Sequence, residues 1–154
     1  MASCRSGAGR DPRMNSFNSN RYLNPALSAT VLRLALGTMW ISHAMLKYSV
    51  LTMTGFATWL ESQGLPGFMA WPVFMMELVG GFAILVGFHG RWSSLALLPI
   101  MLVAAATHVA NGWVHTSAGG GWEYPAFLFI ASIAHFLAGD GALALGRQHR
   151  LQIL

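Results

Sequence analysis

The sequence predicts an all-α integral membrane protein, built as an antiparallel four-helix bundle. The first observation is composition: 55% of the 154 residues are hydrophobic and only 9% are charged, against about 25% charged in a typical soluble domain. The second is four apolar runs, each near the roughly 20 residues that cross a bilayer as a helix. They cover residues 26–46, 68–88, 92–110 and 124–145. Their continuous apolar character excludes alternating barrel strands, so helices remain.

Short connections between the runs predict an up-down-up-down order. Pro72 near the start of the second run suits a first helical turn, where no amide donor is needed. Pro99 lies inside the third run and is expected to bend that helix. The amphipathic piece 56–60 is expected to lie along the outer membrane interface. The glycines 119–121 predict a flexible tether that can fold over the mouth of the bundle.

The distribution of charge predicts the orientation. The net charge is +4, but the basic residues do not form one patch, which argues against nucleic-acid binding. Loops 48–67 and 111–123 contain no Lys or Arg, whereas both tails and the turn between the second and third runs do. By the positive-inside bias, we expect a multi-pass protein of the bacterial inner (plasma) membrane with cytoplasmic N and C termini.

We divide the chain into a disordered basic cytoplasmic tail (1–25), a four-helix membrane domain (26–146) and a cytoplasmic C-terminal tail (147–154). Cys4 is the only cysteine, which excludes a dithiol relay within the chain. The sequence contains no nucleophile elbow, Walker loop, dinucleotide-binding turn or haem attachment motif. Proton-coupled redox chemistry with a lipophilic carrier, transport, or no chemistry at all are the remaining classes.

Ionisable side chains inside the apolar runs mark the candidate site, because each costs about 2.5 to 3.5 kcal/mol on insertion scales. His43 and Lys47 are four residues apart, hence on one face of the first helix near its outer end. A rise of about 1.5 Å per residue places Glu77 at a similar depth. His108 falls near the outer end of the third helix, and Glu123 opens the fourth. We expect these five residues to converge in a polar pocket that opens toward the outer face.

Structural alternatives remain open for this layer. Glu77 could serve only stability, by pairing with Lys47 or by capping a backbone group. His108 and His135, taken singly, are typical of buried core histidines. His43, His108 and Glu77 could form a two-histidine, one-carboxylate metal set. No spacing of the His-Glu-x-x-His type supports that set, so no metal site is predicted.

A second layer of charge lies toward the inner side. Arg33 and Asp140 have opposite charge at similar depth, which predicts a structural ion pair that fixes helix order. Alternatively, Arg33 extends to the lipid headgroups. Gly37 and the pair Gly80-Gly81 are suited to close approach of helices in lipid.

Several of these residues form a pattern: Leu32-Arg33-Leu34, His43 with Lys47, and Glu77 followed by Gly80, Gly81, Gly87 and Arg91. In this pattern the chain resembles the DoxX family of small four-helix bacterial membrane proteins, from about Leu32 through Leu145. It departs from the family's pattern at Ala44, where glycine is common, and at Gly139-Asp140-Gly141.

The resemblance implies a membrane subunit linked to oxidoreductase systems, such as thiosulfate:quinone oxidoreductases or partners in thiol-redox responses. The leading hypothesis is that the outer pocket holds a quinone or a similar lipophilic electron carrier. Lys47 and His43 would hydrogen-bond the ring carbonyls, and Glu77 would exchange the accompanying proton. His108 and Glu123 would complete the binding site. Electron transfer would need a partner redox protein, and a homo-oligomer is a further possibility.

Two other classes of function stay open. A non-catalytic scaffold or assembly subunit would use the polar groups only for helix order. In a small-solute transporter, the binding site would need access from both membrane faces. Four spans without internal repeats offer few elements that could alternate that access.

Overall fold

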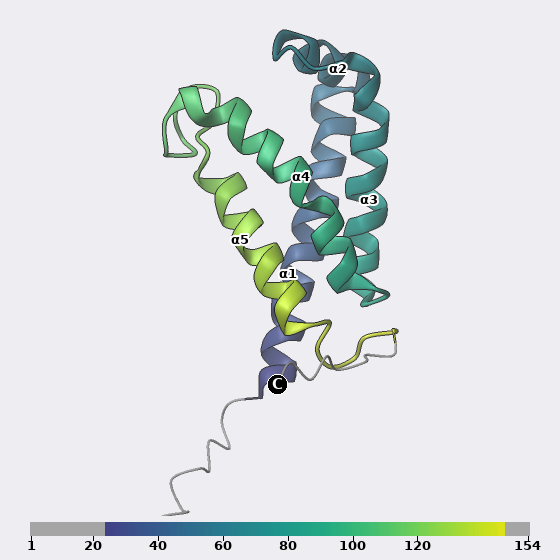
Figure 1. Ribbon diagram of the computed structural model, residues 1–154. Coiled ribbons are helices and arrows are strands. Elements are labelled where there is room, and N and C mark those ends of the chain that lie inside the picture. Colours follow the sequence, from purple (N-terminus) through teal and green to yellow (C-terminus); the bar gives the residue numbers. More distant parts are fainter. Residues whose placement is uncertain (1–23, 147–154) are drawn as a thin grey trace, which may run out of the picture.

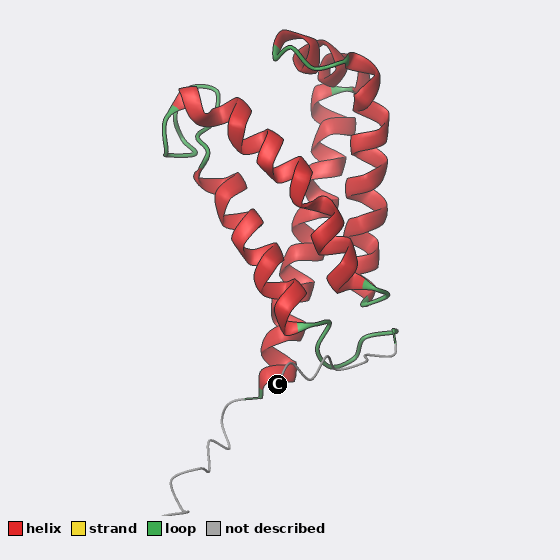
Figure 2. Ribbon diagram, viewed as in Figure 1, coloured by secondary structure: helices red, strands yellow, loops and turns green. Residues whose placement is uncertain are grey.

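The computed structural model describes residues 24–146, and these residues form helices, turns and loops without a strand (Figure 2). Residues 1–23, which fall in the tail predicted to be disordered, and the C-terminal tail 147–154 lie outside the described residues. The long helices are α1 (Pro25–Leu46), α2 (Met53–Ser62), α3 (Ala70–Val86), α4 (Gly90–His108) and α5 (Glu123–Ala138). Short helical turns follow α1, precede α3 and follow α4: η2 (Lys47–Leu51), η3 (Gly67–Met69) and η4 (Val109–Asn111).

Four of these helices run lengthwise, and α2 lies across one end (Figure 1). Helix α3 packs along α1, α4 packs against both α3 and α5, and α5 also contacts α1. Toward the end that carries α2, α4 and α5 lean away from α1 and α3. We call this end the α2 end. The opposite end, where α1 begins and the segment after α5 lies, is the terminal end.

Local sequence signals set where the helices begin and end. The Asn24 side chain accepts hydrogen bonds from the amides of Ala26 and Leu27, while Pro25 occupies the first helical turn. Helix α3 ends at Gly87, whose φ of 72° is the left-handed conformation that glycine adopts without strain. Pro99 lies inside α4 without ending it. The capping chemistry therefore agrees with the apolar runs read from the sequence.

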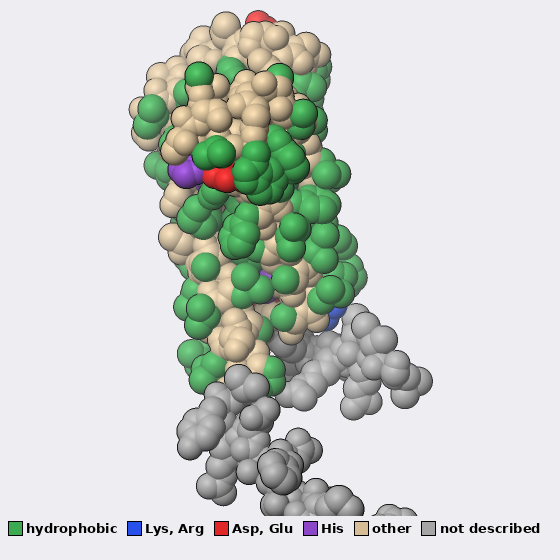
Figure 3. Space-filling view, turned by 90° about the vertical axis from the view of Figure 1, so that its left-hand side faces the viewer, with side chains coloured by type: hydrophobic (Ala, Val, Ile, Leu, Met, Phe, Trp, Pro, Cys, Tyr) green, Lys and Arg blue, Asp and Glu red, His purple; other side chains and the backbone are tan. Residues whose placement is uncertain are grey.

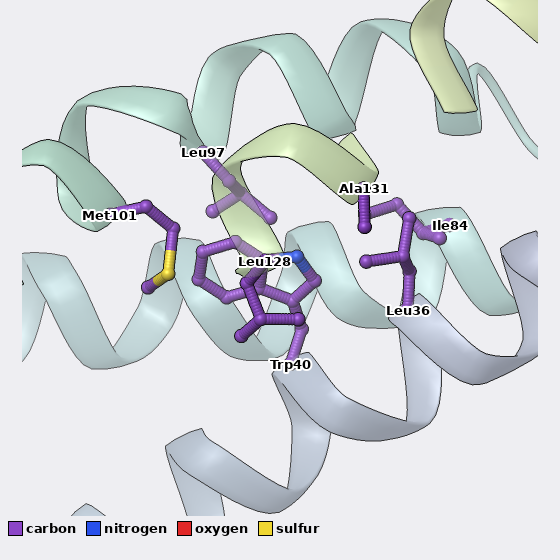
Figure 4. Packing of buried hydrophobic residues seen from close by; sticks show 7 residues of the cluster. All are labelled: Leu36, Trp40, Ile84, Leu97, Met101, Leu128 and Ala131. Atoms are coloured by element: carbon purple, nitrogen blue, oxygen red, sulfur yellow. The ribbon is translucent and has the colours of Figure 1, made fainter. Parts of the chain in front are cut away.

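The apolar core gathers around Trp40 in the middle of the bundle (Figure 4). Trp40 of α1 is fully buried, and side chains from α3, α4 and α5 surround it. The cluster consists of Leu36, Trp40, Ile84, Leu97, Met101, Leu128 and Ala131. Since all four lengthwise helices contribute, this cluster fixes their mutual packing.

Glycines bring α1 and α3 into backbone contact. A Cβ atom on Gly37 would lie 2.8 Å from Cα and N of Leu85, and one on Gly81 would lie 3.0 Å from the Trp40 side chain. Gly80 instead faces α4, where a Cβ would lie 2.9 Å from Cδ1 of Leu97. The predicted use of these glycines for close helix approach is thus visible in the structure.

Three segments are long and apolar enough to cross a membrane: Pro25–Leu51, Gly67–Val86 and Gly90–Asn111. The fourth predicted span was too long, because α5 ends at Ala138 instead of residue 145. Its 16 residues rise about 24 Å, less than the roughly 30 Å of a hydrocarbon core. Apolar side chains are nevertheless exposed over much of the face seen in Figure 3, interspersed with other side chains and backbone, which dominate its upper end. The described residues form an all-helical fold suited to a membrane, with three segments long and apolar enough to span it and one shorter apolar lengthwise helix, α5.

The chain after α5 leaves the helix because Gly139 adopts φ 79° and ψ −179°, a positive-φ conformation that glycine accepts without a steric penalty. It then runs across the terminal end. The amide of Ala142 donates to the carbonyl of Ala26, and the amides of Leu145 and Gly146 donate to carbonyls at the end of α3. This segment therefore joins the start of α1 to the end of α3, where the sequence predicted further helix.

Candidate functional site

A cavity of about 650 Å³ lies at the α2 end, within the 300 to 1,000 Å³ range typical of small-molecule sites. Its wall is mainly apolar and comes from every long helix and from the loop before α5. The polar or titratable side chains in the wall are His43, Lys47, Glu77, Thr107, His108, His115 and Tyr124. Four of the five residues predicted for the outer layer therefore line one cavity, and Glu123 does not.

Lys47 and Glu77 form the central contact of this cavity. The Lys47 ammonium lies 2.9 and 2.7 Å from the two carboxylate oxygens of Glu77. Glu77 is fully buried and the Lys47 side chain is 15% exposed. Lys47 also lies over the ring of Phe56 in α2, 5.5 Å from its centroid. A lysine at the end of α1 thus satisfies the carboxylate in the middle of α3.

His43 lies one turn before Lys47 and contacts Tyr124, which was not among the predicted site residues. Its Nε2 atom lies 2.8 Å from the Tyr124 hydroxyl, and the two rings stack with centroids 5.0 Å apart. Tyr124 stands in the first turn of α5, where an aromatic residue is also typical of an interfacial belt. The spacing of histidine and tyrosine in the sequence gives no sign of this contact, because they belong to different helices.

His108 completes one side of the cavity. Its Nδ1 atom donates to the carbonyl of Ala104, 2.7 Å away in the same helix. In the neutral ring, Nε2 is then an acceptor. The ring tilts against Trp59 of α2 with centroids 6.1 Å apart. A Cβ on Gly120 would lie 3.4 Å from the ring, so the loop before α5 passes directly over this histidine.

Glu123 holds that loop instead of lining the cavity. One carboxylate oxygen accepts from the His115 backbone amide at 2.8 Å and lies 2.5 Å from the His115 ring. The Asn111 side chain donates to the carbonyl of Gly119 at 3.0 Å, and the Trp113 and Trp122 rings meet edge to face. The glycine tether therefore forms part of the cavity wall through Gly120 and Gly121, and the role of Glu123 in binding a ligand stays a prediction.

A separate buried polar cluster lies toward the terminal end. His135 is fully buried, and its Nδ1 atom lies 2.7 Å from the Ser94 hydroxyl. Its Nε2 atom lies 3.4 Å from the Asp140 carboxylate. The Nη2 atom of Arg33, which is 3% exposed, donates to the carbonyl of Leu143 at 3.4 Å. His135 is thus the buried core histidine that the sequence suggested, with partners that the sequence did not reveal.

Asp140 lies at the junction of this cluster with α4. Burial alone would raise the pKa of its carboxyl group. The hydrogen bond and charge of His135, the backbone amide of Arg91 and the charge of Arg33 outweigh burial and hold that pKa below its usual value. Arg33 thus acts on Asp140 electrostatically, while their direct ion pair stays a prediction. The contact with the Arg91 amide also satisfies an open donor at the start of α4.

Metal ligation has no candidate in the described part of the chain. Among residues 24–146, no group of three or more His, Cys, Asp or Glu side chains is placed to hold a metal ion.

Long apolar helices with buried charged residues define the class of helical integral membrane proteins. The chain belongs to the DoxX family, whose family model matches residues 28–116. The match covers α1 to α4 and part of the loop that follows, so it includes Lys47 and Glu77 and ends before Tyr124. No curated protein and no solved structure matches the chain.

Proposed function

We propose that this DoxX-family chain is a membrane component of a bacterial oxidoreductase system, and that its cavity holds a quinone or a similar lipophilic electron carrier. In this proposal the chain lies in the inner membrane with cytoplasmic termini, and the α2 end faces outward. The single observation that carries the proposal is a fully buried Glu77 bound to Lys47 in the wall of a large, mainly apolar cavity.

The polar groups of the wall suit a ring with two carbonyl oxygens. An ammonium group has three N–H donors, and the two Glu77 oxygens occupy two of them. The third donor of Lys47 is available to a carbonyl. The His43–Tyr124 pair and the Nε2 atom of His108 offer further hydrogen-bonding positions on other sides of the cavity. Flat apolar rings and hydrocarbon fit the remaining wall.

Glu77 and Lys47 supply the proton chemistry of the proposal. A quinone becomes a quinol by taking up two electrons and two protons, and the electrons come from a partner redox protein that carries its own redox group. Lys47 stabilises charge on the reduced oxygen, and Glu77 passes one of the two protons to it; water at the outer face is the source of the second proton and of the proton that restores Glu77. His43 orients the ring. The chain itself contributes position, charge and exclusion of water.

The most direct experiment is extraction of the protein in mild detergent, followed by mass analysis of the lipophilic molecules that it retains. We expect a quinone with the native protein and at least about tenfold less with Glu77→Ala, a difference of about 1.4 kcal/mol. Glu61→Ala is the matched control, because Glu61 is an exposed carboxylate on α2 outside the cavity wall. The proposal is contradicted if Glu77→Ala retains as much quinone as Glu61→Ala, or if no sample contains quinone.

A scaffold function is the second candidate, and the completeness of the Lys47–Glu77 pair favours it. If the pair only fixes helix order, Glu77→Gln lowers stability and leaves bound quinone unchanged. Parallel measurement of thermal unfolding and of added-quinone binding separates the two functions. Loss of stability alone supports the scaffold, and loss of binding in folded protein supports the carrier site.

Transport is less well supported by the geometry. Arg33, Trp40 and Lys47 lie seven residues apart along α1, about 10 Å per step, and all are buried or nearly buried. The apolar cluster around Trp40 therefore separates the two polar clusters of the described chain (Figure 4). Introduced cysteines at Glu77 and Ser94, labelled from each side, test this: alternating access would favour a transporter.

A further inference from the structure

A second hollow, of about 340 Å³, lies on the surface between α3 and α4. We call it the α3/α4 groove. Its walls are Met75, Met76, Val79, Gly80, Ser93, Ala96 and Leu97. Met76 and Ala96 also line the cavity at the α2 end. Met76, next in sequence to Glu77, and Ala96 therefore border both the groove and the cavity, so only these two side chains lie between the two hollows at this point.

The groove exists because small residues lie between larger ones. Gly80 has no side chain, and a Cβ there would lie 2.9 Å from Cδ1 of the buried Leu97. Ala96 leaves a similar gap on α4, whereas Met75 and Val79 are 48% and 60% exposed and form the rim. Helix α4 also leans away from α3 toward the α2 end (Figure 1), so the seam between the helices widens in the direction of the cavity.

The surroundings of the groove suit hydrocarbon. Both helices belong to segments apolar enough to cross a membrane, and the groove lies on their exposed side. The only polar side chain in its wall is Ser93, whose hydroxyl donates to the carbonyl of His89, the residue that precedes α4, at 3.3 Å. No polar group of the wall then needs water or a polar ligand. An aqueous solute would find no hydrogen-bonding partner on this route.

We infer that the α3/α4 groove seats the hydrocarbon tail of the molecule whose head occupies the cavity. This inference rests on the proposed function and adds the substrate class: a ring with a long lipophilic chain. The head lies beside Lys47 and Glu77, and the tail passes between Met76 and Ala96 into the groove. The molecule then enters sideways from the membrane, while the loop held by His115 and Glu123 covers the cavity at its aqueous end.

The test compares two probes on the full chain in phosphatidylcholine nanodiscs: a tail-less benzoquinone and the same ring with a ten-carbon alkyl chain. Binding is measured by equilibrium partition against protein-free nanodiscs. Val79→Trp fills the groove at a position that does not line the cavity. Val31→Trp is the matched control, since Val31 is a similarly exposed valine on α1.

We expect Val79→Trp to weaken binding of the alkylated probe by about tenfold and to leave the tail-less probe unchanged, while Val31→Trp affects neither. A diazirine at the end of the alkyl chain should label groove residues, and excess unlabelled alkylated quinone should prevent that labelling. If Val79→Trp has no effect, or labelling falls elsewhere on the lipid-facing surface, the tail site is wrong although ring binding stands. Labelling that excess quinone does not prevent identifies ordinary bilayer lipid. If neither probe binds, the proposed function and this inference both fail.

Discussion

The ammonium group of Lys47 lies within 2.9 Å of both carboxylate oxygens of Glu77, 30 residues further along the chain. The contact joins the end of α1 to the middle of α3 and leaves neither charge alone in an apolar cavity. In a low-dielectric interior such a pair contributes little net stability over an apolar pair. Removal of one partner is nevertheless severe, because the other charge is then buried and uncompensated.

The first prediction follows from that asymmetry. Lys47→Met alone or Glu77→Leu alone should lower the free energy of unfolding by about 3 to 5 kcal/mol, while the double variant should recover most of the loss. Unfolding in mixed detergent micelles, followed by circular dichroism, measures these differences. Glu61→Gln, which changes an exposed carboxylate, should stay within about 0.5 kcal/mol of the native chain. Additive losses in the double variant would show that the pair is not coupled.

The second prediction concerns close packing of α1 on α3. Gly37→Ala places a Cβ against the backbone of Leu85, which cannot move aside as a flexible side chain would. We expect a loss of about 1 to 3 kcal/mol in unfolding free energy, typical of overpacking. Gly55→Ala is the control, since its Cβ would have an ordinary 3.4 Å contact with the Thr52 hydroxyl. Equal stability of the two variants would mean that α1 and α3 are packed less tightly than the 2.8 Å distance to Leu85 indicates.

The third prediction concerns the hydrogen bond between α4 and α5. Ser94→Ala removes the partner of Nδ1 in a fully buried His135 ring and should destabilise the protein by about 1 to 3 kcal/mol. Ser93→Ala, one residue earlier, removes only a hydroxyl bonded within its own helix and should have little effect. Thermal unfolding of both variants in the same detergent makes the comparison.

The fourth prediction is a pH dependence of stability. The pKa of Asp140 is lowered in the folded chain, so its ionised form favours folding at pH values above the ordinary value of 3.8. That contribution is lost as the pH falls through 3.8 toward the lowered folded value. Asp140→Asn should therefore reduce the loss of unfolding free energy between about pH 5 and pH 3. Parallel acid-destabilisation curves for the two proteins would contradict this account.

Much of the architecture follows from the sequence because depth in a membrane helix is a simple function of residue number. The apolar runs predict the positions of α1, α3 and α4. The fixed rise per residue also predicts that His43, Lys47 and Glu77 lie at similar depth. Their contribution to one cavity then depends on helix rotation. The four-residue spacing of His43 and Lys47 fixes their shared face, whereas nothing local fixes the face of α3 that carries Glu77.

The predictions were less successful where the chain leaves regular helix. The fourth run is apolar to residue 145, but hydropathy does not register that Gly139 turns the chain out of the helix after Ala138. The depth of Glu123 predicts a place in the pocket. In the structure its carboxylate bonds His115 of the preceding loop, and a role in ligand binding stays a prediction. Depth alone cannot show which way a side chain at a helix end points.

The sequence by itself determined that this chain is a helical membrane protein of the DoxX family, with costly charges at two depths. Hydrogen bonds within each helix satisfy the backbone in lipid, so continuous apolar runs are sufficient to specify those helices. The partner of each polar side chain follows from the tertiary structure alone: Tyr124 for His43 and Ser94 for His135. The same holds for the cavity wall, to which every long helix contributes. The physical reason is that these contacts depend on how helices rotate and tilt against one another. The packing of the glycines and of the Trp40 cluster sets that rotation and tilt. The spacing of residues along the chain does not predict this packing.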